Sequence, residues 1–271
     1  MKPTLVIHGA GGRMGRRILA LAVEEQVFQI VGAVDHPAHP ELGKDAGVLA
    51  GVSPIGVNLD KSFPEKAFVV IDFSLPQAAA ETISWAEKTG TALVMATTGL
   101  DSAQMELLIK ATQKIAIVQA TNMSLGMNLL FSIVGKVAAA LGTDYDIEIT
   151  EAHHRFKKDS PSGSALSLAK SICDATSRSY PYCLVHGREG KEALRQAGTI
   201  GMHAIRAGDI VGQHSVIYGT LGETITISHN AHSRDVVAHG ALRAATWVLT
   251  HNPGLYTLQH VLGLAKASYA I

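Results

Sequence analysis

A glycine-rich turn close to the start of the chain constrains the fold more than any other feature. Thr4–His8 is a short apolar run typical of a buried strand, and Met14–Glu25 has the apolar spacing of a helix. Gly9, Gly12 and Gly15 stand between them in a variant of the dinucleotide-binding fingerprint. Such glycines let the backbone approach a pyrophosphate, and the helix start offers free N–H groups to that anion. The turn predicts a dinucleotide-binding α/β domain, with an ordinary strand–helix turn as the alternative.

An acidic residue follows the second predicted strand, Ile30–Val34. This residue, Asp35, lies about 20 residues beyond the glycine turn, where a carboxylate hydrogen-bonds the adenosine ribose; a solvated turn residue is the alternative. Because a carboxylate repels a 2′-phosphate, we expect NADH to be preferred, while a protonated His36 would leave NADPH use open. The cofactor contacts expected in this part of the chain are Gly9, Ala10, Gly11, Gly12, Arg13, Met14, Asp35 and His36.

Short apolar runs alternate with helical stretches through the rest of the first half of the chain. Strands are expected over residues 67–71, 92–95 and 115–118, and helices over residues 77–89 and 102–112. This alternation predicts a Rossmann-type, doubly wound parallel sheet covered on both faces. Ligands of such sheets bind beyond the strand C-termini, where each segment alone could also be a plain loop. Contacts on the nicotinamide side are therefore expected from Ala96, Thr97, Thr98, Ala120, Thr121, Asn122 and Met123.

The pattern changes after a long predicted helix over residues 127–141. Asp146–Glu151 alternates polar and apolar residues, as a strand with one open face does. Similar stretches follow at residues 203–206, 215–218 and 223–229. A last predicted helix over residues 234–249 returns to the first domain. We therefore expect a second α+β domain with a mixed or antiparallel sheet, giving a domain division into residues 1–124 with 234–271, and residues 125–233.

A segment dense in polar side chains follows the first of these alternating strands. Histidine is the usual proton donor near neutral pH, and His153 and His154 are adjacent here, with Lys157 able to bind an anion or deliver a proton. A Pro-Ser-Gly-Ser helix start follows, and the N–H groups of Gly163 and Ser164 could bind a carboxylate. Adjacent histidines point apart and lack partners at ligand spacing, so no metal is expected. A basic surface loop before a capped helix is the alternative.

Composition narrows the classes of binding partner and cellular compartment that the chain could have. Lys+Arg and Asp+Glu balance at 23 each, so no overall basic field favours nucleic acid or an anionic membrane as partner. Two cysteines, Cys173 and Cys183, are too few for a disulfide framework and fit a reducing compartment. The stretch Leu129–Leu141 contains Lys136 and is expected to be too short to span a membrane. With no export signal visible, a cytoplasmic location is expected.

Residues 151–165 resemble the E-x-H-H-x-x-K-x-D-x-P-S-G-T-A motif of the dihydrodipicolinate reductase family. Gly9–Gly15 resembles that family's cofactor loop, and Ile71–Ser74 resembles its D-F-T/S turn. Gly201 and the segment Arg206–His214 resemble its I-G-x-x-x-x-R-x-G-D-I-V-G-x-H block. The likeness covers nearly the whole chain, and its most specific part is the combination of His-His-Lys with Pro-Ser-Gly.

The resemblance implies NAD(P)H-dependent reduction of a small dicarboxylate, 4-hydroxy-tetrahydrodipicolinate, to tetrahydrodipicolinate in lysine and diaminopimelate biosynthesis. It implies His153 as general acid/base and Lys157 as proton donor, and which of the two delivers the proton stays open. It further implies that His154, Gly163 and Ser164 bind the substrate. Family members are homotetramers joined through their C-terminal sheets, so residues 125–233 would serve both substrate binding and oligomerisation.

Four positions depart from the family pattern: Ser164 stands where Thr is usual, Ala96 where Gly is usual, His36 where some members carry Arg, and Met123 where an aromatic residue is common. These departures bear on cofactor preference more than on reaction class. Two other functions stay open. A different two-domain NAD(P)-dependent dehydrogenase of amino or hydroxy acids should lack the His-His-Lys and Pro-Ser-Gly set. A non-catalytic NAD(H)-sensing module would need no proton donor.

Overall fold

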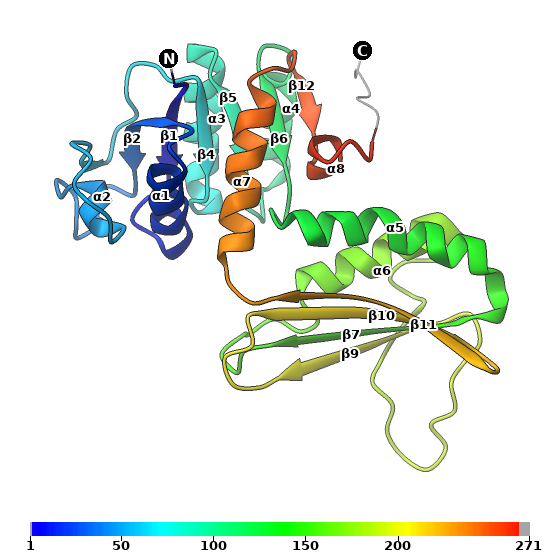
Figure 1. Cartoon of the computed structure of the whole chain (residues 1–271). Coiled ribbons are helices and arrows are strands. Elements are labelled where there is room, and N and C mark those ends of the chain that lie inside the picture. Colours follow the sequence, from blue (N-terminus) through cyan, green and yellow to red (C-terminus); the bar gives the residue numbers. More distant parts are fainter. Residues whose placement is uncertain (1, 266–271) are drawn as a thin grey trace. The chain divides into compact units, whose positions relative to one another are not determined.

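The computed structural model describes residues 2–265 and divides the chain into two compact units. The first unit contains the residues up to Leu125 together with those from Asp235 onward, and the second contains Gly126–Arg234 (Figure 1). The second unit is therefore an insertion between two segments that fold together.

The first unit is built on a seven-stranded parallel sheet in the order β12-β6-β5-β4-β1-β2-β3. From β3 to β6 this is the order of a doubly wound, Rossmann-type fold, as the sequence predicted. The strands are β1 (Thr4–His8), β2 (Gln29–Val34), β3 (Leu59–Asp60), β4 (Val69–Asp72), β5 (Ala92–Met95), β6 (Ala116–Gln119) and β12 (Gly254–Tyr256).

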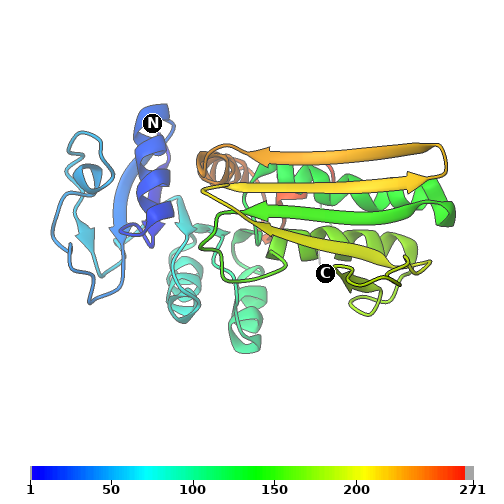
Figure 2. The ribbon, with the colours of Figure 1, turned by 90° about the horizontal axis from the view of Figure 1, so that it is seen from below.

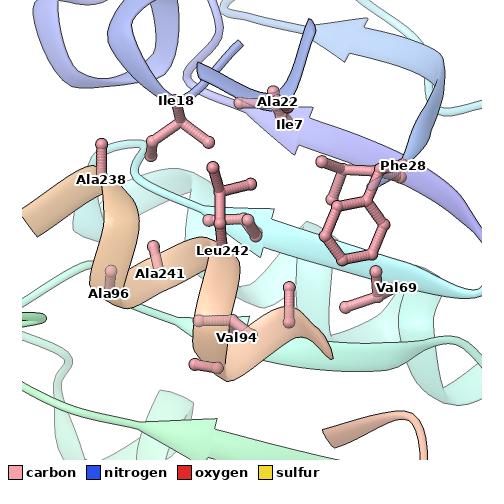
Figure 3. Close-up of a cluster of buried hydrophobic side chains, with 14 of the residues drawn as sticks. Ile7, Ile18, Ala22, Phe28, Val69, Val94, Ala96, Ala238, Ala241 and Leu242 are labelled. Atoms are coloured by element: carbon pink, nitrogen blue, oxygen red, sulfur yellow. The ribbon is translucent and has the colours of Figure 1, made fainter. Parts of the chain in front are cut away.

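Successive side chains of a strand point to opposite faces of the sheet. Because both sets of side chains are apolar here, helices cover both faces. Ile7, Val69 and Val94 lie in one fully buried cluster with Leu242 of α7 (Figure 3), and Val70 lies in another cluster on the opposite face. Truncating Ile7 or Leu242 to Ala would cost about 2–5 kcal/mol. The helices of this unit are α1 (Arg13–Glu25), α2 (Ala46–Leu49), α3 (Pro76–Thr89), α4 (Ser102–Ala111), α7 (Asp235–Val248) and α8 (Leu258–Val261).

The second unit is an α+β unit with a five-stranded mixed sheet in the order β11-β10-β7-β9-β8. Figure 2 shows its long strands β11, β10, β7 and β9 side by side. Strand β10 is antiparallel to β7 and β11, whereas β9 is parallel to β7 and β8. Ile149, Val216 and Leu168 share the hydrophobic core between the sheet and its helices. The elements are α5 (Leu125–Leu141), the 3-10 turn η1 (Gly142–Asp144), β7 (Asp146–His153), α6 (Gly163–Thr176), β8 (Leu184–His186), β9 (Ile200–Arg206), β10 (Gly212–Thr220) and β11 (Glu223–Ala231).

Helix α5 is longer than the sequence suggested. Together with η1 it forms a 20-residue apolar helix, Leu125–Asp144, which has the length and composition of a membrane span, so the expectation that this stretch is too short was wrong. One side of the helix, including Met127 and Val134, lies in the hydrophobic core of the second unit. The buried Tyr218 hydroxyl also donates to the Val134 carbonyl at 2.6 Å. Within the described residues, one side of α5 thus packs in the core of the second unit, while about a third of the helix (33%) is buried.

Candidate active site

The glycine turn between β1 and α1 can be built only with glycine at two of its positions. Gly9 has φ +80°, and a Cβ there would lie 2.5 Å from the Phe73 carbonyl oxygen. A Cβ on Gly15 would lie 2.0 Å from the Gly9 carbonyl oxygen, which is far inside van der Waals contact. Among residues 2–265, no side chain caps the start of α1 at Gly12. The exposed helix start is therefore left to an anion or to water.

Asp35 is held directly against this turn. Its Oδ2 accepts from the Gly11 N–H at 2.8 Å, and its Oδ1 accepts from the His36 N–H at 2.7 Å. A carboxylate has about four acceptor positions, so each oxygen keeps capacity for another hydroxyl. Asp35 and His36 line a cavity of about 650 Å³ together with Gly9, Gly12, His8, Lys61 and Phe73. The residues present therefore fit the adenosine half of a dinucleotide.

The predicted contacts farther along the sheet gather at a second cavity. Thr97, Thr98, Ala120 and Thr121 line a space of about 180 Å³ beyond the C-terminal ends of β5 and β6. The remaining predicted cofactor residues lie around these cavities rather than on their walls: Arg13 is exposed, Ala10, Ala96 and Met123 are buried, Met14 packs on the core, and the Asn122 side chain accepts from the Ser124 N–H.

A buried polar network lies beneath the strand ends, and sequence reasoning missed it. Asp72, at the end of β4, is 0% exposed and accepts from the hydroxyl of Thr97 at 2.6 Å. Its other oxygen lies 3.4 Å from Nδ1 of His8, which also contacts the Thr82 hydroxyl at 2.6 Å. Burial would raise the pKa of Asp72, but His8, Thr82 and Thr97 outweigh it and hold the pKa at about 2. The carboxylate is therefore ionised at neutral pH.

In the second unit, the buried carboxylate of Glu151 organises the polar segment. The Arg206 guanidinium donates to both carboxylate oxygens at 2.8 Å, and the Ser162 N–H donates at 3.0 Å. Nδ1 of His153 lies 2.6 Å from Oε2. Burial would raise the pKa of Glu151, but the bonds from Arg206, His153 and Ser162 lower it overall. Four bonds therefore hold an ionised carboxylate in the interior.

This anchoring fixes the tautomer of His153. The ionised Glu151 carboxylate accepts a hydrogen bond from Nδ1–H, which leaves Nε2 as the atom that exchanges protons. Burial lowers the pKa of His153, Glu151 raises it, and the charges of Lys157 and Arg206 lower it further, so that it lies below the ordinary value of 6.5. The imidazole is therefore mainly neutral at pH 7, with a lone pair at Nε2.

A second buried histidine supports the start of α6. Ser162 caps α6 by accepting from the Ala165 N–H at 3.2 Å, and its hydroxyl lies 3.0 Å from Nε2 of His214. Burial, and next the charge of His153, lowers the pKa of His214 to about 4. The rings of His153 and His214 meet edge to face at 5.2 Å. The neutral His214 thus contacts both the Ser162 cap of α6 and the ring of His153.

The predicted substrate residues lie in the same segment. Lys157 pairs with Asp159 at 2.9 Å, and its N–H donates to the His154 carbonyl. Gly163 and Ser164 form the first turn of α6, with Gly163 exposed. Nδ1 of His154 is buried without a hydrogen-bond partner among the described residues. The segment thus contains an ammonium, a helix start and an imidazole, which are groups that bind anions.

Glu151, Arg206, Ser162 and His214 all occur in the motifs that suggested the family. Sequence reasoning predicted a serine cap at this helix start, which Ser162 provides, but it gave Glu151, Arg206 and His214 no role. Their signal was present as motif letters, but only the register of β7 against β9 and β10 brings them to one place. Among residues 2–265, no group of three or more His, Cys, Asp or Glu side chains could hold a metal ion.

These features define the class of two-domain NAD(P)-dependent oxidoreductases. One unit is doubly wound and has a glycine turn with an anchored acidic residue, and the other unit has an acid–base cluster.

The chain belongs to the dihydrodipicolinate reductase family. The N-terminal model of that family matches residues 4–123, and its C-terminal model matches residues 126–262. A 4-hydroxy-tetrahydrodipicolinate reductase of Alkalilimnicola ehrlichii is 45% identical over 97% of this chain and 100% of its own length. One of Rhodopirellula baltica is 43% identical over 97% of this chain and 96% of its own length. Membership of this reductase family implies use of NAD(P)H.

Among solved structures, the dipicolinate-bound dihydrodipicolinate reductase of Paenisporosarcina sp. TG-14 shares the fold. Its TM-score is 0.74 at 20% identity, and the match covers 95% of this chain and 98% of that one. The Rossmann-type sheet joined to a mixed-sheet unit is therefore the fold that the sequence predicted.

Proposed function

We propose that this protein reduces 4-hydroxy-tetrahydrodipicolinate to tetrahydrodipicolinate with NAD(P)H, in lysine and diaminopimelate biosynthesis in the cytoplasm. The observation that carries the proposal is the anchored imidazole of His153, bonded to Glu151 at 2.6 Å and within electrostatic reach of Lys157. A module that only sensed NAD(H) would need no such pair. Names of relatives that are 40–45% identical over almost the whole chain support the same substrate.

The substrate carries two carboxylates, and the second unit offers matching donors. Lys157 supplies an ammonium, and the first turn of α6 supplies the N–H groups of Gly163 and Ser164 with the positive end of the helix dipole. His154 adds a ring whose Nδ1 is buried without a partner among the described residues. These groups orient the ring, and orientation of this kind contributes a large share of a rate enhancement.

The reaction eliminates water from the hydroxylated ring and then reduces the conjugated product. When bound, NAD(P)H supplies the hydride. Nε2 of the neutral His153 is suited to accept a ring proton during elimination, because Glu151 stabilises the imidazolium that results. Lys157 is suited to deliver a proton to the leaving hydroxyl or to the reduced ring. This assignment gives the two residues different roles.

The finer points of cofactor use and assembly extend the proposal. Asp35 faces the adenosine cavity with both oxygens available, which favours NADH, while Lys61 and His36 on the same wall would tolerate a 2′-phosphate. The protein would be a homotetramer joined through the mixed sheet of the second unit. This assembly follows from the likeness of the second unit to the C-terminal part of the dihydrodipicolinate reductase family.

The test is a coupled assay with enzymatically made substrate, following NADH and NADPH loss separately at about 340 nm, where the reduced nicotinamide absorbs. His153→Gln and Lys157→Ala should each lower kcat by about 10²–10⁴-fold. Lys158→Ala, an exposed neighbour in the same segment, is the matched control and should keep kcat within about twofold. Near-normal kcat in both test variants would overturn the assignment, and tight NADH binding without turnover would support the sensing module.

A further inference from the structure

The buried network at the ends of β1, β4 and β5 occupies a particular position in the first unit. Asp72 lines neither cavity, but its partners line both: His8 and Ser74 line the larger cavity, and Thr97 lines the smaller one. Burying a carboxylate is costly unless it is fully bonded; Asp72 is 0% exposed, and among the described residues its hydrogen bonds all go to Oδ1, while Oδ2 has only the 3.4 Å approach of His8. A buried ionised group placed between two ligand cavities calls for an explanation beyond packing.

We infer that Asp72 is a positioning residue for the reaction, which holds the Thr97 hydroxyl and so fixes the loop of residues 96–98 against the nicotinamide half of the cofactor. The inference rests on the proposed function. It concerns a residue that touches neither cofactor nor substrate and acts through Thr97.

The bonds of Asp72 tie this loop at two points. Oδ1 accepts from the Thr97 hydroxyl at 2.6 Å, and the Asp72 carbonyl oxygen accepts from the Ala96 N–H at 3.0 Å. The same Oδ1 accepts from the N–H of Ser74 at 2.9 Å and from its hydroxyl at 2.7 Å. One carboxylate oxygen therefore joins the loop after β4 to the loop after β5.

The charge of Asp72 makes these bonds stronger than neutral ones. Bonds to an ionised acceptor are shorter and roughly twice as strong as neutral bonds, which agrees with the 2.6 Å distance to Thr97. Hydride transfer needs the nicotinamide placed within a fraction of an ångström, and a misplacement of about 1 Å can cost about 100-fold in rate. A charged anchor behind the loop provides that rigidity without entering the cavity.

The test compares two buried threonines at opposite ends of the same strand. Thr97 follows β5 and binds Asp72, whereas Thr91 precedes β5 and donates to the Ala67 carbonyl at 3.0 Å. Thr97→Val should lower kcat about tenfold and raise the primary deuterium isotope effect with 4-deuterated NADH, while Thr97→Ser should restore kcat to within about twofold. Thr91→Val should lower the melting temperature but leave kcat and the isotope effect unchanged.

A second measurement separates positioning from loss of binding. ADP-ribose lacks the nicotinamide, so its Kd should stay within about twofold in Thr97→Val and in Asp72→Asn, because it engages only the turn near Gly9 and Asp35. Equal kcat losses in Thr97→Val and Thr91→Val, or wild-type kcat and isotope effect in Thr97→Val, would overturn the inference. If Asp72→Asn does not fold, the threonine variants still decide the question.

The proposed function and this inference fail in different ways. Absence of turnover by the wild-type protein would reject the proposed function. In that case the fluorescence of bound NADH still reports the nicotinamide environment. A changed emission in Thr97→Val that Thr97→Ser restores would uphold the positioning role, and identical spectra in all variants would reject it.

Discussion

Two buried carboxylates, one in each unit, solve the same electrostatic problem with different partners. Asp72 and Glu151 are 0% and 1% exposed, and each has a histidine nearby, His8 and His153 respectively. Asp72 is bonded mainly by hydroxyls and an N–H group, whereas Glu151 is bonded by a guanidinium on both oxygens.

The difference teaches what each carboxylate is suited to do. Neutral hydroxyl donors leave the charge of Asp72 in place and use it to tie loops together. The Arg206 guanidinium pairs with the charge of Glu151. The buried carboxylate therefore keeps a counter-charge whether the His153 imidazole that it orients is protonated or neutral. We therefore expect Asp72 to act on placement and Glu151 to act on proton transfer.

The largest expected effect comes from Glu151→Gln. Removing the charge leaves the Arg206 guanidinium without a counter-ion and replaces one accepting oxygen with an amide NH2 group, so kcat should fall on the order of 100-fold. The free energy of unfolding should fall by about 3–5 kcal/mol. Glu148→Gln is the matched control, because Glu148 lies on the same strand, is partly exposed, and pairs with Arg188 and His203 instead. Similar losses of kcat in Glu151→Gln and Glu148→Gln would mean that Glu151 has no special role in proton transfer.

A smaller effect concerns the pH dependence of stability. The pKa of Asp72 is about 2 in the folded protein against an ordinary value of 3.8, so its stabilisation is fully present above pH 3.8 and is lost as pH falls through 2. This difference corresponds to about 2 kcal/mol. Urea unfolding of wild type and Asp72→Asn between pH 6 and pH 2 should show the gap narrowing by about that amount on acidification. A gap independent of pH would contradict an ionised Asp72.

A still smaller effect is expected at the adenosine cavity. Lys61→Ala removes a positive charge from the wall that also carries Asp35, so kcat/KM for NADPH should fall about twofold to fivefold relative to NADH. Lys66→Ala, an exposed lysine five residues along the chain, should leave the ratio unchanged. An equal change in both variants would mean that the effect comes from overall charge.

The last expected effect is a pair of opposite shifts in the titration of His153, followed by NMR of the imidazole. Glu151 raises the pKa of His153, so Glu151→Gln should lower it further below 6.5. The charge of Lys157 lowers that pKa, so Lys157→Ala should raise it. Because His153 acts as a base in the proposal, wild-type kcat/KM should fall as pH drops through this pKa. Shifts in the same direction in both variants would reject the described electrostatics.

Sequence predicted the parts of the fold that have a periodicity. The three-residue spacing of Gly9, Gly12 and Gly15 and the short apolar runs identified the doubly wound sheet, and alternation along Asp146–Glu151 identified the mixed one. Strands β3, β8 and β12 were missed because two or three residues carry no measurable period.

The sites divide in the same way. His153 and Lys157 stood together in one segment, so sequence could suggest their chemistry. Arg206 reaches Glu151 across 55 residues, and Thr97 reaches Asp72 across 25. Such pairs depend on strand register, which a single sequence does not reveal for strands joined by long connections.

The insertion of the second unit has a consequence for synthesis on the ribosome. Helix α7 supplies Leu242 and several alanines to the core of the first unit, and β12 pairs with β6, yet both emerge only after Gly126–Arg234 has been made. At about 5–20 residues per second, the nascent first unit waits on the order of 5–20 s with part of one apolar sheet face uncovered. During that interval it is a natural client for chaperones, although the finished protein has no such need.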